Sequence, residues 1–182
     1  MKMHKNTTIA AVAGLALLFT AGAVVGADRD QRGQLPERDY KFVKEAASGG
    51  ISEVEIGELA KQKGVSQAVR DFGDRMATDH KKANDELKEI ASKKGAVIPA
   101  QLSRSENSTM NRLQKLNGAE FDKAYASAMV KDHKADVKAF KDAADDVKDP
   151  DVKAFAQKMI PKLEEHLRMA QEMEASVKQS KL

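Results

Sequence analysis

Residues 69–90 read VRDFGDRMATDHKKANDELKEI, and this stretch decides the fold class. Its apolar side chains recur at alternating intervals of three and four residues, the period of one face of an α-helix in a bundle. The positions on that face are Val69, Phe72, Met76, His80, Ala83, Leu87 and Ile90. The stretch therefore predicts a long helix whose apolar face, interrupted by one histidine, packs inside a helical bundle.

Three other segments show the same pattern. The predicted inner face of the first consists of Phe42, Ala46, Gly49, Glu53, Ile56 and Ala60, and that of the second of Tyr125, Met129, His133, Val137, Phe140, Ala144 and Val147. The predicted inner face of the third consists of Val152, Ala156, Met159, Leu163, His166, Ala170, Met173 and Val177. In the first segment the adjacent row Val43, Ala47, Gly50 and Val54 competes for the inner position. Aromatic residues make up only 4% of the 182 residues, which disfavours a large β-sandwich or a doubly wound parallel sheet.

The breaks between these segments predict the topology. Helices are expected over 38–63, 66–94, 119–147 and 150–177, with Pro161 inside the last one as a source of a kink or a later start. Very short links make two antiparallel hairpins, and the long link 95–118 is expected to hold a short extra helix. The predicted fold is all-α, a ferritin-like four-helix bundle over residues 38–182 in which a crossover joins two hairpins.

The first 27 residues predict export. Lys2, His4 and Lys5 precede an apolar run that ends in the small residues Val25-Gly26-Ala27, as in a Sec-type signal peptide cleaved after Ala27. An uncleaved anchor helix is the alternative, at the short edge of what spans a bilayer. Residues 28–37 are expected to form a linker, and the mature protein is expected in the periplasm or secreted, without a membrane span.

Charge and cysteine content exclude several classes of protein. Without Lys2 and Lys5 the chain carries 29 Lys and Arg against 28 Asp and Glu, or +1, which gives no electrostatic footprint for nucleic acid. The chain has no Cys, which excludes disulfides and thiolate metal sites.

Each predicted inner face is interrupted by one titratable residue: Glu53, His80, His133 or His166. All four lie within about two positions of the midpoints of their helices, or about 3 Å along the axis, so they should meet in one layer of the core. One carboxylate and three imidazoles form a ligand set for a single transition metal ion such as zinc, iron, copper or manganese.

Other interpretations of these residues stay open. The four groups could form a metal-free polar network with Glu53 as the counter-charge, or fail to converge. Glu55 or Glu58 could face inward instead of Glu53. The acids that precede the histidines, Asp79, Asp132 and Glu165, could orient a histidine on a neighbouring helix, although solvated positions are the more common role of such residues.

The chain resembles a bacterial exported ferritin-like family of unknown function, whose members are usually described only as outer-membrane or periplasmic proteins. The matching stretches are ASGGISEVEIGELA (47–60), FGDRMATDH (72–80), GAEFDKAYASAMVKDH (118–133) and LEEHL (163–167). The resemblance spans roughly residues 38–175. It implies a four-helix bundle exported from the cytoplasm and no established activity.

The sequence therefore favours an exported bundle that binds one transition metal ion through Glu53, His80, His133 and His166, with a role in metal handling or envelope stress. The alternative is a non-enzymatic envelope interaction or structural protein with a metal-free polar core. A metalloenzyme with an open coordination position is the third hypothesis. No catalytic motif or substrate pocket is identified, which favours a non-enzymatic role. Ferritin-type dimetal centres need a Glu three residues before a His, and Ala77, Val130 and Leu163 stand there instead.

Overall fold

The computed structural model describes residues 31–98 and 100–179, which form five helices. They are α2 (Glu37–Lys63), α3 (Gln67–Lys93), α4 (Arg104–Gln114), α5 (Gly118–Asp146) and α6 (Pro150–Gln179). No strand occurs over these two ranges, so the expected all-helical class is confirmed. The predicted signal peptide, residues 1–27, lies outside the described residues.

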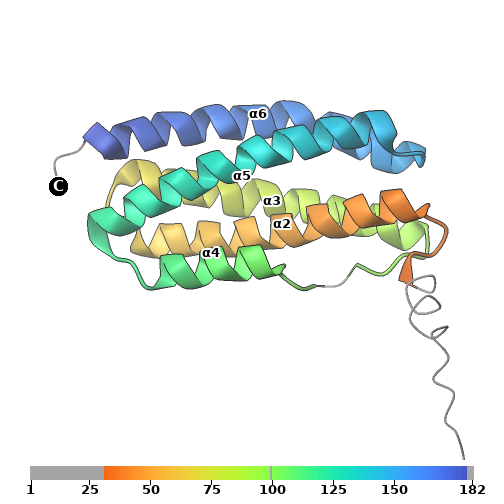
Figure 1. Ribbon diagram of the computed structural model, residues 1–182, viewed down its shortest axis with the longest axis horizontal. Coiled ribbons are helices and arrows are strands. Elements are labelled where there is room, and N and C mark those ends of the chain that lie inside the picture. Colours follow the sequence, from red (N-terminus) through yellow and green to blue (C-terminus); the bar gives the residue numbers. More distant parts are fainter. Residues whose placement is uncertain (1–30, 99, 180–182) are drawn as a thin grey trace, which may run out of the picture.

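The helices form two hairpins joined by a long crossover (Figure 1). α2 and α3 pack against each other as one antiparallel hairpin, and α5 and α6 as the other. The segment between α3 and α5 returns along the bundle, and its helix α4 packs on α2 and α5. α5 consequently runs in the same direction as α3. The crossover helix α4 is the short extra helix expected from the sequence.

The helix ends follow the local sequence closely. Ser66 accepts a hydrogen bond from the Val69 N–H at 3.3 Å and caps α3. Ser103 and Glu106 form a capping box at the start of α4. Pro150 is the first residue of α6, where its missing N–H costs nothing. Pro161 is expected either to kink α6 or to delay its start. Because α6 begins at Pro150 and continues past Pro161, the later start does not occur.

Each hairpin holds the loop of the other through a buried aspartate. Asp39 on α2 accepts hydrogen bonds from Lys148 N–H at 2.9 Å and Asp149 N–H at 2.6 Å, in the α5–α6 link. Asp122 on α5 accepts bonds from the N–H groups of the α2–α3 link at 3.1 and 2.8 Å. A buried carboxylate with backbone donors joins elements far apart in sequence. These two contacts therefore fix the relative height of the two hairpins.

The stretch before α2 also packs on the bundle. Leu35 is only 2% exposed, and the Gln34 N–H donates to the Lys94 carbonyl at 2.9 Å. The Val97 N–H donates to the Gln31 carbonyl at 2.7 Å. From residue 31 onward, the segment predicted as a linker is thus in contact with the start of the crossover.

The apolar core consists of two clusters at opposite ends of the bundle. One cluster takes its side chains from the start of α2 and α6 and the end of α3 and α5, including Val43, Leu87 and Phe155. The other takes them from the opposite halves of the same helices, including Phe72 and Met173. The middle layer between the two clusters is left to other side chains.

The inner face of α2 differs from the predicted one in its first half. Val43, Ala47 and Gly50 are buried there, whereas Phe42, Ala46 and Gly49 are only half-buried. From Glu53 onward the predicted row is the buried one. The adjacent row lies toward α3, where Gly50 leaves room for Asn84, while the row with Phe42 borders α5, where Phe42 meets Phe140 edge-on at 5.0 Å.

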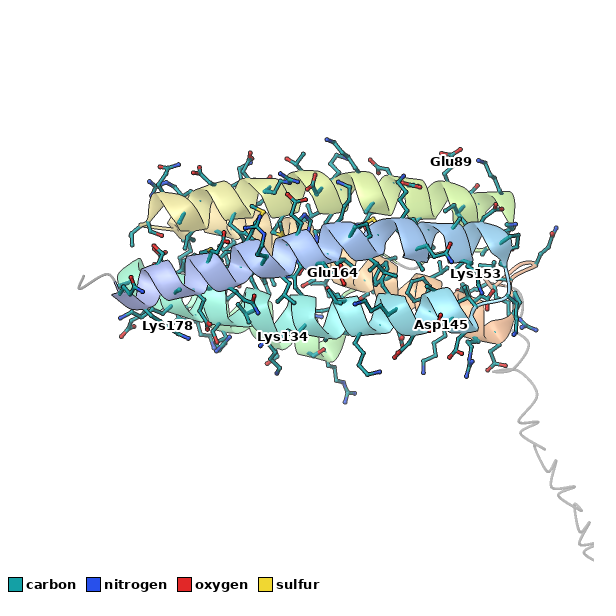
Figure 2. All side chains as sticks on the ribbon, turned by 90° about the horizontal axis from the view of Figure 1, so that it is seen from above. Glu89, Lys134, Asp145, Lys153, Glu164 and Lys178 are labelled. Carbon is teal, nitrogen blue, oxygen red and sulfur yellow. The ribbon has the colours of Figure 1, made fainter. Side chains whose placement is uncertain are left out.

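Charged side chains cover the outer faces of the bundle. Glu89, Lys134 and Lys178 point away from the core in Figure 2. Pairs such as Lys138–Asp142 and Lys141–Glu164 lie across one turn or between helices. Among the described residues, no helix has both the length and the apolar character to cross a membrane.

The close packing of α2 on α3 at Gly57 predicts a position that cannot accept a methyl group. A Cβ added at Gly57 would lie 2.6 Å from the Gly73 carbonyl oxygen and 3.0 Å from the Ala77 nitrogen, both backbone atoms. We expect Gly57→Ala to lower the free energy of unfolding by about 1–3 kcal/mol despite the better helix propensity of Ala. Urea unfolding measures the change.

Gly49→Ala on the same helix is the matched control. The nearest atom to its added Cβ is Glu106 Oε1 at 4.0 Å. Helix propensity should then dominate and raise stability by up to about 1 kcal/mol. A gain of similar size for Gly57→Ala would contradict the close crossing.

Candidate metal centre

Four helices each place one titratable side chain in the layer between the two apolar clusters. Glu53 comes from α2, His80 from α3, His133 from α5 and His166 from α6. Their exposed fractions are 1%, 6%, 0% and 0%. The structure thus brings together all four residues predicted as ligands.

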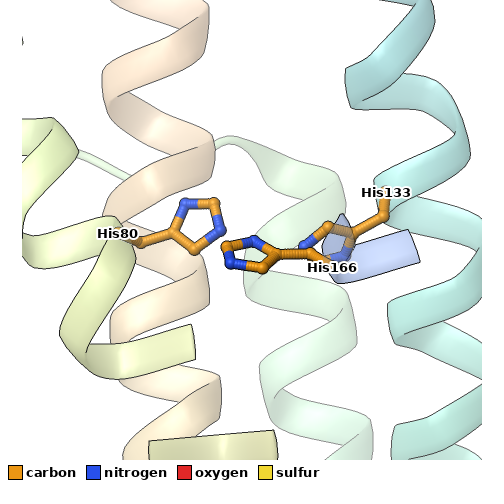
Figure 3. Close-up of side chains that lie close together, drawn as sticks. All are labelled: His80, His133 and His166. Atoms are coloured by element: carbon orange, nitrogen blue, oxygen red, sulfur yellow. The ribbon is translucent and has the colours of Figure 1, made fainter. Parts of the chain in front are cut away.

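The side chains converge on one point. One ring nitrogen from each of the three histidines lies within 4.8 Å of the others. Figure 3 shows the rings turned toward one another, and their centroids are 5.4 to 5.8 Å apart. Glu53 Oε2 lies 2.5 Å from His80 Nε2 and 3.4 Å from His133 Nε2. The arrangement is compact enough that the group could hold a metal ion.

Hydrogen bonds on the outer nitrogens fix the tautomers of two rings. His133 Nδ1 lies 3.0 Å from the Met129 carbonyl oxygen, to which only a protonated nitrogen can donate. His166 Nε2 lies 3.0 Å from Asp79 Oδ2, which likewise takes a proton donor. In the neutral rings, the other two nitrogens, His133 Nε2 and His166 Nδ1, therefore carry lone pairs. This is how imidazoles that bind metals are oriented.

Several inner polar atoms lack hydrogen-bond partners. Within the described part of the chain, these include Glu53 Oε1, His133 Nε2 and His166 Nδ1. Glu53 Oε2 and His80 Nε2 lie 2.5 Å apart and can form an ion pair when the ring is protonated. An unsatisfied buried polar group costs about 1–3 kcal/mol. His133 Nε2 and His166 Nδ1, which carry lone pairs, are left without a donor, and this indicates a place for a positively charged partner.

The electrostatics of the layer favour a cation. Burial alone would raise the pKa of Glu53, but the neighbouring His133 and His80 outweigh it and lower the pKa to about 2. Burial works against the charged form of His80, and the Glu53 carboxylate outweighs that and raises the pKa of the ring. Burial, with Glu53 and Asp132 nearby, raises the pKa of Asp136 to about 8. Glu53 is thus ionised, and its carboxylate favours a positive charge among the imidazoles.

The question of which glutamate of α2 faces the core has a clear structural answer. Glu55 is exposed, and the Glu58 side chain is 47% exposed and bonded to Lys61 at 3.1 Å. Glu53 is the one that enters the layer. One turn of α2 separates it from Gly57, where the helix lies close to the backbone of α3.

The three acids that precede the histidines have different roles. Asp79 orients His166 on the neighbouring helix and is itself held by Arg75. For Asp79 the solvated role favoured from the sequence is therefore wrong, because α3 and α6 are rotated so that this flank faces His166. Asp132 is exposed, and Glu165 lies at the surface 3.5 Å from Arg75.

Tyr125 is a further polar residue of this region, and no sequence pattern distinguishes it from the apolar residues of its helix face. The residue is fully buried, and among the described residues its hydroxyl has no partner. Its ring lies edge-on to Phe72 at 6.2 Å, and Phe72 lies edge-on to His133 at the same distance. Burial raises the pKa of Tyr125 well above its usual value. Aromatic rings thus seal the α5 side of the layer.

The depressed pKa of His166 predicts a pH-dependent stability of the metal-free protein. Burial lowers that pKa from 6.5 to about 4, and the hydrogen bond to Asp79 opposes the shift only in part. The unfolded chain binds this proton more readily, so the free energy of unfolding should fall as the pH drops from about 6.5 to about 4. The loss should be on the order of 3 kcal/mol.

Urea unfolding with a chelator present, near pH 7 and near pH 4.5, measures this loss. His166→Gln removes the titrating ring while keeping an amide of similar size. The difference in unfolding free energy between the two proteins should therefore change across this range. A constant difference would contradict the depressed pKa of His166.

Comparisons with known proteins place the chain in a family without assigning an activity. A family model described as Domain of unknown function (DUF4142) matches residues 26–173. No functionally curated protein matches the chain in sequence. The crystal structure of a DUF305 fragment from Deinococcus radiodurans is similar, with a TM-score of 0.69 and 12% identity over 80% of this chain and 99% of that chain. That likeness shows a shared fold alone, whereas the family match covers most of the sequence, and the chain therefore belongs to the DUF4142 family of domains of unknown function.

Proposed function

We propose that this protein binds one transition metal ion between its two hairpins, through Glu53, His80, His133 and His166. The observation that carries the proposal is the convergence of three buried imidazoles beside the Glu53 carboxylate, with His133 Nε2 and His166 Nδ1 left without hydrogen-bond partners. A divalent cation would satisfy all of them at once. Two of the histidines also have their outer nitrogens held by hydrogen bonds, as metal ligands usually do.

The donor set favours an ion of borderline character. Three imidazole nitrogens and one carboxylate suit zinc, iron, copper and manganese, and geometry rather than affinity separates these metals. A tetrahedral zinc ion with bonds of about 2.1 Å would hold its ligand atoms about 3.4 Å apart. The three ring nitrogens lie within 4.8 Å of one another, so small rotations of the rings would suffice.

The wider role that we propose is metal handling or protection of the cell envelope under stress, in an exported protein. The amino-terminal sequence supports export, and the two hairpins with a crossover support a ferritin-like bundle. A mononuclear ion is favoured over a dimetal centre because Ala77, Val130 and Leu163 stand where bridging glutamates would be needed. None of these features requires an enzymatic activity.

Metal titration of the chelator-treated protein tests the proposal. We expect one Co²⁺ or Zn²⁺ per chain, with d–d absorption bands of Co²⁺ that indicate nitrogen and oxygen ligands. Saturating metal should stabilise the protein by about 2.7 kcal/mol when the free ion is at 100 times its Kd. His133→Gln should abolish this stabilisation, and Glu55→Gln, an exposed neighbour of Glu53 on α2, should preserve it.

The hydrogen bond from His166 to Asp79 gives a second, graded prediction. Asp79→Asn should weaken metal binding by about 10- to 100-fold, because the ring loses its negatively charged partner. Glu165→Gln is the matched control, since this acid also precedes a histidine but lies at the surface. The proposal fails if His133→Gln loses the same stability with metal as with chelator, or if no ion binds.

A metal-free polar core is the competing function for this layer, in an envelope protein that acts through its outer faces. The approach of Glu53 to His80 favours it, because a carboxylate and a protonated ring can form an ion pair without metal. Such a pair leaves His133 Nε2 and His166 Nδ1 without partners. Elemental analysis of protein isolated without chelator separates the two functions.

A further inference from the structure

The proposed site is almost completely buried, so an ion needs a way in. His133 and His166 are fully buried, and Glu53 is 1% exposed. We infer that a divalent transition metal ion reaches the site through a cavity beside His80, and that Asn84 and Asp136 are oxygen donors that bind it on the way. This inference rests on the proposed function, since it concerns the loading of the same site.

A cavity of about 100 Å³ lies beside the site. Its wall includes the exposed residues Glu45 and Ala139 as well as the buried residues Leu163 and His80. His80 is the only one of the four proposed ligands that lines it. It also has the largest exposed fraction of the four, 6%. The cavity therefore leads to the site past this one ligand.

Two oxygen donors stand on the cavity wall next to His80. Asn84 follows His80 by one turn of α3, so the two side chains share a face of that helix. Asp136 comes from α5, one turn after His133. Amide and carboxylate oxygens are harder ligands than imidazole and hold borderline metal ions less strongly. The pair is thus suited to receive an ion and pass it on.

The backbone of α2 makes room for one of these donors. A Cβ added at Gly50 would lie 2.1 Å from Asn84 Oδ1, so the amide occupies the space that a side chain would fill. Both residues line the cavity. The missing side chain at Gly50 allows the amide of Asn84 to lie between α2 and α3 at the level of the cavity.

His80 is also the ligand best placed to move. The rings of His133 and His166 are held on their outer nitrogens by Met129 and Asp79. Rotation of His80 would open the layer toward the cavity without disturbing those two hydrogen bonds.

A second hollow, beneath α4, does not serve as well. It has a volume of about 250 Å³ and is lined by residues such as Ser52, Thr109 and Arg112. None of the four proposed ligands lines it.

Kinetics of metal uptake and release test the route. Stopped-flow experiments measure the uptake of Co²⁺ and its release to an excess of chelator. Ala139→Phe should slow both uptake and release by about tenfold. The Kd should stay nearly unchanged, because an obstacle on the route alters both rates. Ala135→Phe, at an exposed position one turn earlier on α5 and away from the cavity, should keep the rates of the parent protein.

Asp136→Asn gives an independent measurement in case the large Phe side chain disturbs the fold. The substitution keeps the shape of the side chain and replaces its carboxyl group with an amide, a weaker ligand for metal ions, so uptake of Co²⁺ should slow by about tenfold. Circular dichroism confirms that each variant is folded.

The outcomes separate the two proposals. If the parent protein binds one ion per chain and both Ala139→Phe and Asp136→Asn load at the rate of Ala135→Phe, the route is wrong and the metal site stands. If the parent protein binds no Co²⁺ or Zn²⁺, the proposed function fails and the route fails with it. Slower loading of both variants at an unchanged number of bound ions supports the route.

Discussion

The structure depends on one constraint, which is that four polar side chains share a single layer between two apolar clusters. Glu53, His80, His133 and His166 are almost completely buried there. Each polar atom left without a partner in such a place costs about 1–3 kcal/mol. A chain without disulfides has only packing and hydrogen bonds to offset that cost. The layer therefore lowers the stability of the metal-free fold. A cation at its centre would satisfy these polar atoms and so bind favourably.

The remainder of the bundle keeps the four groups at one height. The crossing at Gly57 and Gly73 sets how closely α2 and α3 approach, one turn from Glu53. Asp39 and Asp122 each tie one hairpin to the loop of the other. Shifts of a helix along its axis would break these contacts as well as the convergence of the side chains. The contacts far from the layer therefore help to maintain the convergence of the four side chains within it.

The sequence predicts the layer well because helical periodicity and height along a helix are both local properties. A residue at the middle of its helix stays at mid-height whichever way the helix runs, so the position of His133 follows without knowing the topology. Rotation about the helix axis is different, since it depends on neighbours. For this reason the sequence does not predict that the buried row at the start of α2 contains Val43 rather than Phe42. Nor does it predict whether Asp79 is solvated or contacts His166, which lies 87 residues away. The loop contacts of Asp39 and Asp122 depend on the same long-range information.

The charges around the layer also bear on what it can hold. Glu53 is the carboxylate that faces the imidazoles directly, and Asp79 lies behind His166. Together they would balance the two positive charges of a divalent ion, one by direct contact and one through the ring. A buried charge is tolerated only when it is paired and hydrogen-bonded. Asp79 meets both conditions through Arg75 and His166, and Glu53 would gain its partner from the ion. A second divalent ion would need at least two more carboxylates in the layer. Asp136 lies half-buried on the cavity wall and Asp132 is exposed, so the balance of charge within the layer favours a single ion.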